Sequence, residues 1–355
     1  MAKVAHILYG GLGGQVDLVR DLVTHNLMRE HEHMIVFYGI EQPSSQTMKA
    51  YEVDNVVLHT IHYRPGQWIY SIKQLFKLLK RYLPSTIILH NNELIPFMGL
   101  WSWLNKCNCI VVEHQSLTLK GLKGWMASTM SLILAKRVVY LTTAYREGVL
   151  KRIRLFFNER KVVIINNGVN LNQFLPVHRP LSHSLILGMV SRINNIKDHE
   201  TLIRAFGKAN ISKSILKLAG DGDEVLRLKR LVRQLKLGER VKFVGVISGT
   251  DLIDFYQSLD VYTHATFGET MSVSIAQAQA CGLPVIASKV NGVIEVIKHE
   301  VNGLLVENES GWIENIKLLA GSTELRVKLG NNSHAYASKH LSHDAMVLKY
   351  NNLIE

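Results

Sequence analysis

A segment near residue 270 combines an acidic side chain with the start of a short helix. Residues 267–272 lead into a helical pattern that Gly282 and Pro284 bring to an end. The first backbone N–H groups of a helix lack partners within it, so this helix start favours an anion such as phosphate. Glu269 precedes the helix and Gln277 lies two turns into it, so both could face one ligand. A carboxylate beside an anion site suits hydroxyl groups, which together point to a nucleotide-sugar; the alternative is that Glu269 only caps the helix.

Two cations follow another predicted strand. The apolar run 185–190 ends near Ser191, so Arg192 and Lys197 should project from the carboxyl edge of a sheet, where doubly wound folds bind ligands. Two positive charges there could bind an anion such as a diphosphate. The alternative is that both are ordinary solvated side chains, and the presence of Glu269 favours the site.

An Asp-x-Asp pattern follows the strand predicted over 214–219. Asp221 and Asp223 alternate with Gly220 and Gly222 and lead into a helix. Such a pair occurs in some metal sites, but two carboxylates need further oxygen ligands to hold a hard cation. We therefore expect no metal at this turn.

The amino-terminal half offers a glycine loop and one histidine. The loop at residues 10–14 follows a strand but lacks the Gly-x-Gly-x-x-Gly spacing, which argues against a redox dinucleotide. A tight turn that touches no ligand is the alternative interpretation. His114 follows the strand predicted over 109–113 directly; a lone histidine is more often structural than catalytic. Glu113 should point to the opposite face of the sheet.

The elements that carry these residues alternate between apolar strands and amphipathic helices. This alternation predicts an α/β protein with two doubly wound, Rossmann-like domains. In the first domain we expect strands at 3–9, 34–38, 86–90, 109–113, 137–142 and 162–165, with helices at 16–28 and 70–83. In the second we expect strands at 185–190, 214–219, 241–244, 261–264, 284–287 and 303–306, with helices at 199–209, 224–235 and 273–280.

The polar stretch 176–184 is the best candidate for a linker. We therefore assign residues 1–175 to an amino-terminal domain and residues 176–340 to a carboxy-terminal, ligand-binding domain. Residues 341–355 contain a last helix, which is long enough to pack back on the first domain.

Composition and charge exclude several classes of protein. The chain has 355 residues, 47% of them hydrophobic and 20% charged, which excludes a disordered or collagen-like protein. Its three cysteines fit reduced thiols in a cytoplasm, and its longest apolar runs are too short to span a bilayer. Residues 1–175 carry 20 Lys and Arg against 11 Asp and Glu, while residues 176–355 carry 21 against 18.

The excess of cations in the first half should attract polyanions or an anionic membrane surface. The stretch 70–83 has an apolar face and several lysines; we interpret it as a helix covering the sheet, with a membrane-surface helix as the alternative. No helix-turn-helix, RNP motif or zinc finger is visible, so we expect no nucleic acid partner.

The segment from Glu269 resembles the signature of the retaining glycosyltransferases of family 4, which have the two-domain GT-B fold. That signature is a Glu, seven residues, a second Glu, and then Ala-x-Ala-Cys-Gly-x-Pro-Val-Ile. Residues 278–286 read Ala-Gln-Ala-Cys-Gly-Leu-Pro-Val-Ile, and Gln277 replaces the second Glu. Arg192 and Lys197 match the family's phosphate-binding element, although Ser191 and Asp198 replace its glycines.

The resemblance implies a role for each matching residue. Glu269 would contact hydroxyls of the donor sugar, Gln277 the ribose, and His114 the sugar from the interdomain cleft. We take four residues as catalytic: His114, Arg192, Lys197 and Glu269. Ten more are expected to bind the donor: Gly13, Gly14, Gly220, Asp221, Gly222, Val244, Thr270, Met271, Ser272 and Gln277. Residues 166–170 resemble the family's hinge element.

These observations predict a retaining glycosyltransferase that uses a nucleoside-diphosphate sugar, with uridine as the first choice of base, and needs neither metal nor cofactor. A glycan or lipid-linked acceptor is expected, as in bacterial polysaccharide or lipopolysaccharide assembly. The expected location is the cytoplasm, with peripheral contact to the inner face of the cell membrane. A nucleotide-sugar 2-epimerase and a non-catalytic nucleotide-sugar-binding protein are the alternatives.

Overall fold

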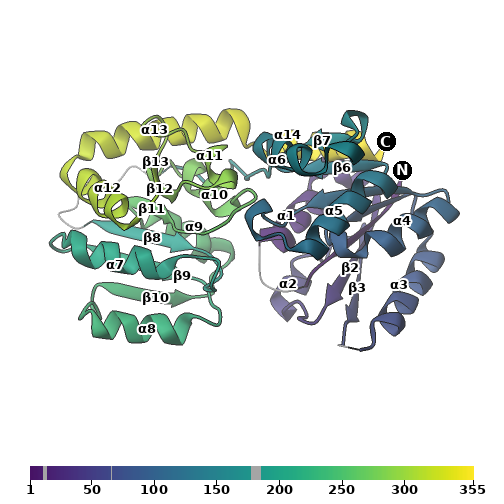
Figure 1. Ribbon diagram of the computed structural model, residues 1–355, viewed down its shortest axis with the longest axis horizontal. Coiled ribbons are helices and arrows are strands. Elements are labelled where there is room, and N and C mark those ends of the chain that lie inside the picture. Colours follow the sequence, from purple (N-terminus) through teal and green to yellow (C-terminus); the bar gives the residue numbers. More distant parts are fainter. Residues whose placement is uncertain (11–13, 65, 177–184) are drawn as a thin grey trace. The chain divides into compact units, whose positions relative to one another are not determined.

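The chain folds into two α/β units. The computed structural model describes residues 1–10, 14–64, 66–176 and 185–355 (Figure 1). Unit 1 comprises Met1–Asn166 and Asp344–Glu355, and unit 2 comprises Asn167–His343. Each unit has one sheet with only parallel strand pairings, as the alternation of apolar and amphipathic segments predicted.

The sheet of unit 1 has seven strands in the order β3-β2-β1-β4-β5-β6-β7. The strands are β1 (Lys3–Leu8), β2 (Glu32–Gly39), β3 (Val56–His62), β4 (Thr86–Leu89), β5 (Asn108–Glu113), β6 (Arg137–Tyr140) and β7 (Val162–Ile164). The central strands are buried on both faces because helices cover the two sides of the sheet. Every strand except β3 overlaps a predicted one.

Two cores lie on opposite faces of this sheet. One buries side chains of α3 (Trp68–Tyr82), α4 (Ile95–Leu104), α5 (Leu122–Leu134) and α6 (Thr143–Ile153). The other buries side chains of α1 (Gly14–Thr24) together with Phe37 and Tyr51, near α2 (Ser45–Lys49). The interpretation of α3 as a helix covering the sheet is confirmed, because Ile72, Leu75 and Leu79 are buried in the first core.

The predicted helix over 16–28 is too long. The α-helix ends at Thr24, and a 3₁₀-helix follows over Asn26–Glu30. The His25 ring accepts a hydrogen bond from the Leu27 amide at 3.2 Å and so begins this new helix. The residues around position 25 are compatible with a helix, so the sequence pattern did not show that the His25 side chain would take the Leu27 amide as its donor.

The sheet of unit 2 has six strands in the order β10-β9-β8-β11-β12-β13. The strands are β8 (Ile186–Val190), β9 (Ile215–Ala219), β10 (Val241–Gly245), β11 (Val261–His264), β12 (Val285–Ser288) and β13 (Leu304–Val306). All six overlap the predicted strands. The helices are α7 (His199–Ala209), α8 (Val225–Gln234), α9 (Gly249–Gln257), α10 (Val273–Ala280), α11 (Asn291–Ile294), α12 (Glu309–Gly321) and α13 (Thr323–His340).

The chain passes between the units at two places in the sequence. The predicted boundary at residue 175 differs from the observed one because Asn167 already bonds within unit 2, to the Met271 sulfur and carbonyl oxygen. Val169 pairs with the segment just before α14 (His343–Ile354): its amide donates to the Leu341 carbonyl oxygen at 2.8 Å. The last helix, α14, belongs to unit 1 from Asp344 onward, and its Asn351 contacts His31 at 2.9 Å. Most of the predicted linker, residues 177–184, lies outside the described residues.

None of the helices in the described part of the chain combines the length and apolar character that crossing a membrane requires. The two longest apolar runs, residues 97–104 and 125–135, lie largely in α4 and α5, which were not predicted as helices.

Loops at the carboxyl ends of β8, β9 and β10 interlock through their backbones. The Ile193 amide donates to Asp221 at 2.8 Å, and the Gly220 amide donates to Gly245 at 2.7 Å. Gly220 has φ +128°, and a Cβ there would lie 1.9 Å from the Ser191 carbonyl oxygen. Only glycine fits this crossing, so the sequence fixes how closely the two loops approach.

Gly220→Ala should therefore destabilise the protein by at least about 2 kcal/mol, through a steric clash and a strained backbone. Gly238→Ala is the matched control, because no heavy atom lies within 4 Å of the Cβ it would add. Denaturant unfolding of both variants measures the effect. Equal stability of the two variants would contradict the close crossing.

Candidate functional site

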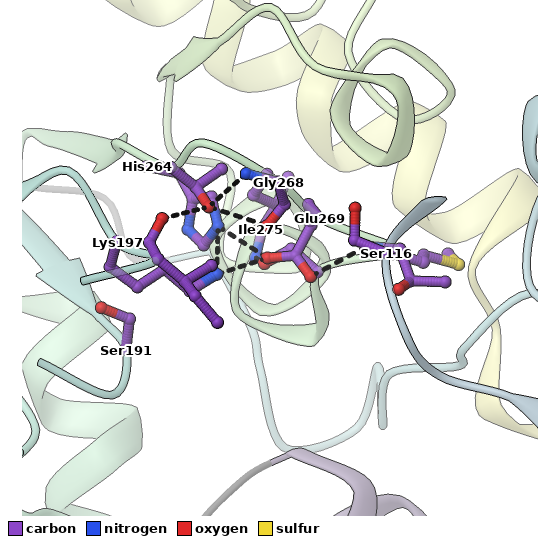
Figure 2. A network of polar contacts seen from close by, with 12 residues as sticks. Ser116, Ser191, Lys197, His264, Gly268, Glu269 and Ile275 are labelled. Carbon is purple, nitrogen blue, oxygen red and sulfur yellow. Dashed lines mark hydrogen bonds and ion pairs between the residues drawn. The ribbon is translucent and has the colours of Figure 1, made fainter. Parts of the chain in front are cut away.

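Three polar side chains meet at the carboxyl edge of the sheet in unit 2: Lys197 and Glu269, which were predicted site residues, and His264, which was not. Lys197 Nζ lies 2.6 Å from Glu269 Oε2, and His264 Nε2 lies 3.1 Å from the same oxygen (Figure 2). Lys197 comes from the loop after β8, His264 is the last residue of β11, and Glu269 follows it by five residues. Lys197 and Glu269, which the sequence indicated separately as site residues, are thus in direct contact.

The Lys197–Glu269 pair keeps its charges although it is mostly buried. Their side chains are only 15% and 17% exposed. Burial raises the pKa of the Glu269 carboxyl, but the Lys197 charge and the His264 hydrogen bond lower it more, so this pKa lies well below its usual range. Burial and the Lys197 charge lower the pKa of His264, so this ring is neutral at pH 7. The site therefore holds an anionic carboxylate and an ammonium side by side.

His264 is the residue of this cluster that the sequence analysis missed. Its Nε2 contacts both Glu269 and Lys197. Its Nδ1 lies 3.3 Å from the Tyr262 hydroxyl. The shorter contact and the negative charge indicate that Nε2–H donates to Glu269. The signal that could have revealed it was position: His264 ends a predicted strand, at the edge where the ligand was expected.

The helix after Glu269 begins with a different cap from the one considered. The Ser272 hydroxyl accepts from the Ile275 amide at 3.2 Å, so Ser272 is the N-cap of α10 and Glu269 is not. Glu269 Oε1 instead accepts from the adjacent Thr270 amide at 3.2 Å. Thr270, Met271 and Ser272, three of the residues expected to bind the donor, are all buried.

The backbone at Glu269 and Thr270 packs closely against α11. A Cβ on Gly292 would lie 2.4 Å from the Glu269 carbonyl oxygen and 2.5 Å from that of Thr270. Thr266 bonds the carbonyl oxygens of Ile196 and Gly268, at 3.2 Å and 2.9 Å. These contacts fix the Glu269 loop against the loop that carries Lys197.

The other cationic and acidic residues of the prediction lie at the same edge but are exposed. Arg192 and Asp221 both face solvent, and Asp221 Oδ1 accepts from the Gly222 amide at 2.8 Å. Within the described ranges, Asp221 and Asp223 are not joined by a third side chain of a kind that ligates metals. Gly220 and Gly222 form the crossing with residues 191–193 described above.

Gln277 and Val244 have different surroundings. Gln277 lies on α10, where its Oε1 accepts from the Tyr256 hydroxyl at 3.0 Å. The Tyr256 hydroxyl also lies 3.1 Å from the Ser274 carbonyl oxygen, so the Gln277 side chain is linked to α9 through Tyr256. Val244 lies near the end of β10 and is 43% exposed. A ribose contact by Gln277 would have to use the rest of its amide.

In unit 1, His114 lies directly after β5 and Gly14 begins α1. Gly13 lies outside the described residues. His114 Nε2 lies 3.2 Å from His90 Nδ1. Burial lowers the pKa of His114 to about 4, against the opposing pull of Glu113, so the ring is neutral at pH 7. His114 belongs to unit 1, whereas the Lys197–Glu269 pair belongs to unit 2.

Glu113 points to the opposite face from His114, as predicted. Its carboxylate accepts from Lys120 at 2.8 Å, Asn92 at 2.9 Å and Tyr145 at 3.2 Å. The Glu113 and Lys120 side chains are fully buried. This network ties the segment after β5 to α5 and α6 and thereby fixes the backbone that carries His114.

Two family models match the chain, one for each half. The model described as "Glycosyltransferase Family 4" matches residues 12–173, and "Glycosyl transferases group 1" matches residues 176–336. The glycosyltransferase MJ1607 of Methanocaldococcus jannaschii, named as uncharacterized, is 34% identical over 161 residues, which are 42% of this chain and 41% of that protein. A GDP-mannose-dependent alpha-mannosyltransferase of Corynebacterium glutamicum is 32% identical over 149 residues, which are 39% of this chain and 34% of that protein.

The aligned region thus spans less than half the length of these curated relatives. Among solved structures, HepE of Anabaena in complex with UDP-glucose matches with a TM-score of 0.85 and 19% identity. That match covers 100% of this chain and 99% of HepE, so the two proteins share the whole two-unit fold.

Removing the Glu269 charge should cost stability in a pH-dependent way. Folding lowers the pKa of Glu269 below its ordinary value of 4.5. The ion pair therefore stabilises the folded state at pH values above 4.5, and this stabilisation is lost as the pH falls toward the pKa of the folded state. Glu269→Gln should lower the free energy of unfolding by about 2 kcal/mol at pH 7, less than for a fully buried pair because both side chains keep some exposure.

Denaturant unfolding of Glu269→Gln at pH 7 and at pH 4 tests this, and the gap to wild type should narrow at the lower pH. Glu307→Gln is the control, since Glu307 forms an exposed pair with Lys289 at 2.6 Å and should change stability little. A gap that is the same at both pH values would contradict the ionised, paired state of Glu269.

Proposed function

The chain belongs to the group 1 glycosyltransferases of family 4, and on that premise we propose that it transfers a sugar from a nucleoside-diphosphate sugar to an acceptor hydroxyl. The observation that supports this most is the Lys197–Glu269 contact in front of α10. A carboxylate kept anionic accepts hydrogen bonds from sugar hydroxyls, and an ammonium beside it attracts a phosphate.

In the proposed reaction, Lys197 and Arg192 stabilise the charge that develops on the diphosphate as the anomeric carbon–oxygen bond breaks. Arg192 is exposed and can reach toward a bound anion. Backbone N–H groups at the start of α10 supply a further partial positive charge. Glu269 orients the sugar through its hydroxyls, and His114 contacts the sugar from unit 1.

We propose that the anomeric configuration is retained. The acceptor hydroxyl attacks the anomeric carbon on the face that the diphosphate leaves, and its proton passes to the departing diphosphate oxygen. This route needs no protein nucleophile, and it suits a site in which the Glu269 carboxylate is already bonded to Lys197 and His264. It also needs no metal, because fixed cations take the charge of the leaving group.

Calorimetric titration with UDP, GDP, ADP and CMP tests the donor site. We expect one diphosphate to bind, with UDP the first candidate because HepE was solved with UDP-glucose, and GDP the second because a relative is named as GDP-mannose-dependent. Lys197→Ala should weaken this binding about 10-fold to 100-fold, through loss of a charge-assisted contact to phosphate. Glu269→Gln should bind the nucleotide with similar affinity.

Lys208→Ala is the matched control, since Lys208 is an exposed lysine of the same unit paired with Glu309. Addition of EDTA should leave binding unchanged. Binding that EDTA abolishes would overturn metal independence and indicate Asp221 and Asp223 as ligands. Absence of binding to all four nucleotides would contradict the donor site.

Product analysis separates the proposed activity from its alternatives. Turnover of donor without acceptor to an epimerised sugar would indicate an epimerase, and binding without turnover over an acceptor panel would indicate a non-catalytic protein. Proton NMR of the product's anomeric signal would show retention or inversion.

We also propose that the acceptor is lipid-linked and that unit 1 contacts an anionic membrane, as in bacterial polysaccharide or lipopolysaccharide assembly. Helices α4 and α5 pack together (Figure 1). Both helices carry large apolar side chains that are exposed. This α4–α5 apolar patch consists of Leu100, Trp103, Leu104, Leu122 and Met126, which are between 55% and 79% exposed. Lys106 and Lys123 are exposed on the same segments, and unit 1 carries most of the net charge.

Co-sedimentation with vesicles tests the membrane proposal. Wild type should bind vesicles containing phosphatidylglycerol more strongly than vesicles of pure phosphatidylcholine. The double variant Trp103→Ala/Leu104→Ala should lower binding several-fold, because it removes two side chains that would enter the interface. Leu226→Ala/Val246→Ala removes comparably exposed apolar side chains from unit 2 and should leave binding unchanged. Equal binding of both double variants would refute the patch.

A further inference from the structure

Four histidines lie in a row across the sheet of unit 1. His33 is on β2, His6 is on β1, His90 directly follows β4 and His114 directly follows β5. These four strands are neighbours in the sheet. Alternation along each strand places all four rings on the α1 side of the sheet, since the residues next to them, such as Ile7 and Met34, are buried in the opposite core.

The rings contact one another nitrogen to nitrogen. His33 Nδ1 lies 3.3 Å from His6 Nε2, His6 Nδ1 lies 3.4 Å from His90 Nε2, and His90 Nδ1 lies 3.2 Å from His114 Nε2. The ring centroids are 5.4, 5.7 and 5.4 Å apart. Each centroid separation exceeds the nitrogen separation by about two ring radii, as expected for rings that meet edge to edge through hydrogen bonds.

One end of the row is fixed by the backbone. His33 Nε2 lies 3.0 Å from the Met28 carbonyl oxygen, which can only accept, so the hydrogen of His33 is on Nε2. His33, His6 and His90 are buried. Burial lowers the pKa of His33 to about 4 and those of His6 and His90 well below their ordinary value, so each ring is neutral and has a single N–H.

The direction of every bond in the row then follows. Because His33 carries its hydrogen on Nε2, its Nδ1 accepts, and His6 must donate from Nε2. The same step repeats at His90 and at His114. No other arrangement of four neutral rings satisfies all three contacts and the Met28 carbonyl.

We propose that His33, His6 and His90 are positioning residues that set the tautomer of His114, so that its hydrogen is on Nε2 and its lone pair is on Nδ1. Any group that His114 meets through Nδ1 must then bring a hydrogen. If the proposed function holds, a sugar hydroxyl can donate that hydrogen, whereas an ionised phosphate oxygen has none to donate. The device selects a neutral, hydrogen-donating part of the substrate at His114.

Nitrogen NMR of the protein labelled with ¹⁵N-histidine tests this without any ligand, so its result is independent of whether the chain is a glycosyltransferase. At pH 7 the His114 signals of wild type should show a protonated Nε2 and an unprotonated Nδ1, and the other three rings should show the same pattern. A His114 that is charged, or protonated on Nδ1, would overturn the proposal regardless of any variant.

His33→Phe removes the bond to Met28 at the far end of the row. The two ¹⁵N shifts of His114, well separated in wild type, should then converge as both tautomers become populated, although two rings lie between the substitution and His114. His31→Gln is the matched control: His31 is also buried and lies beside His33, but it bonds Ala2 and Asn351 and is not in the row. It should leave the His114 shifts unchanged.

Unchanged His114 shifts in His33→Phe would show that local contacts alone set its tautomer and would refute the role of the row. If His33→Phe does not fold, His90→Leu breaks the row next to His114 and gives the same readout. Thermal unfolding of each variant confirms that the shifts come from folded protein. Nucleotide calorimetry on the same samples tests the proposed function separately, because a normal histidine spectrum with no nucleotide binding would refute only that function.

Discussion

The structure depends on one constraint of parallel sheets: every strand ends at the same edge. In a parallel sheet the connections return along the helices, so the loops that follow the strands are neighbours even when they are far apart in the sequence. In unit 2 this brings the loop after β8, which carries Lys197, beside the end of β11, which carries His264. In unit 1 it brings His90 and His114 into contact at the ends of β4 and β5.

Each unit buries a lysine–glutamate pair, and the degree of exposure distinguishes their roles. Lys120 and Glu113 are fully buried among Asn92, Tyr145 and Ser128, so the pair has no room to exchange partners and acts as a structural tie. Lys197 and Glu269 keep about one sixth of their side-chain surface exposed. A partly exposed pair can share its charges with an incoming ligand, because the ligand replaces a fraction of the contact without leaving either charge isolated.

Much of the fold and part of the site could be predicted from single segments. The apolar strands that are buried on both faces were predicted because their side chains form continuous apolar runs, whereas edge strand β3 is mostly half-exposed and has a weaker pattern. Arg192, Lys197 and Glu269 could be predicted because each lies next to a strand end or helix start. The row of histidines could not, since His33, His6, His90 and His114 are separated by tens of residues and only the strand order β2-β1-β4-β5 brings them together. The Tyr256–Gln277 bond was hidden for the same reason.

The row of histidines in unit 1 and the Lys197–Glu269 pair in unit 2 respond to burial in opposite ways, and on the proposed function this difference suits the two ends of a nucleotide-sugar. In the row, burial removes charge: it lowers the pKa of all four imidazoles, and the neutral rings contact one another nitrogen to nitrogen. In unit 2, charge survives burial because Lys197 and Glu269 stabilise each other. When a glycosidic bond to a diphosphate breaks, negative charge grows on the phosphate oxygens while the sugar hydroxyls remain neutral. A fixed ammonium stabilises the charge that grows on the phosphate oxygens, whereas it has no such effect on the sugar hydroxyls, which stay neutral. A neutral nitrogen lone pair, in contrast, recognises a hydroxyl and repels a phosphate oxygen, so it adds selectivity without competing for the leaving group.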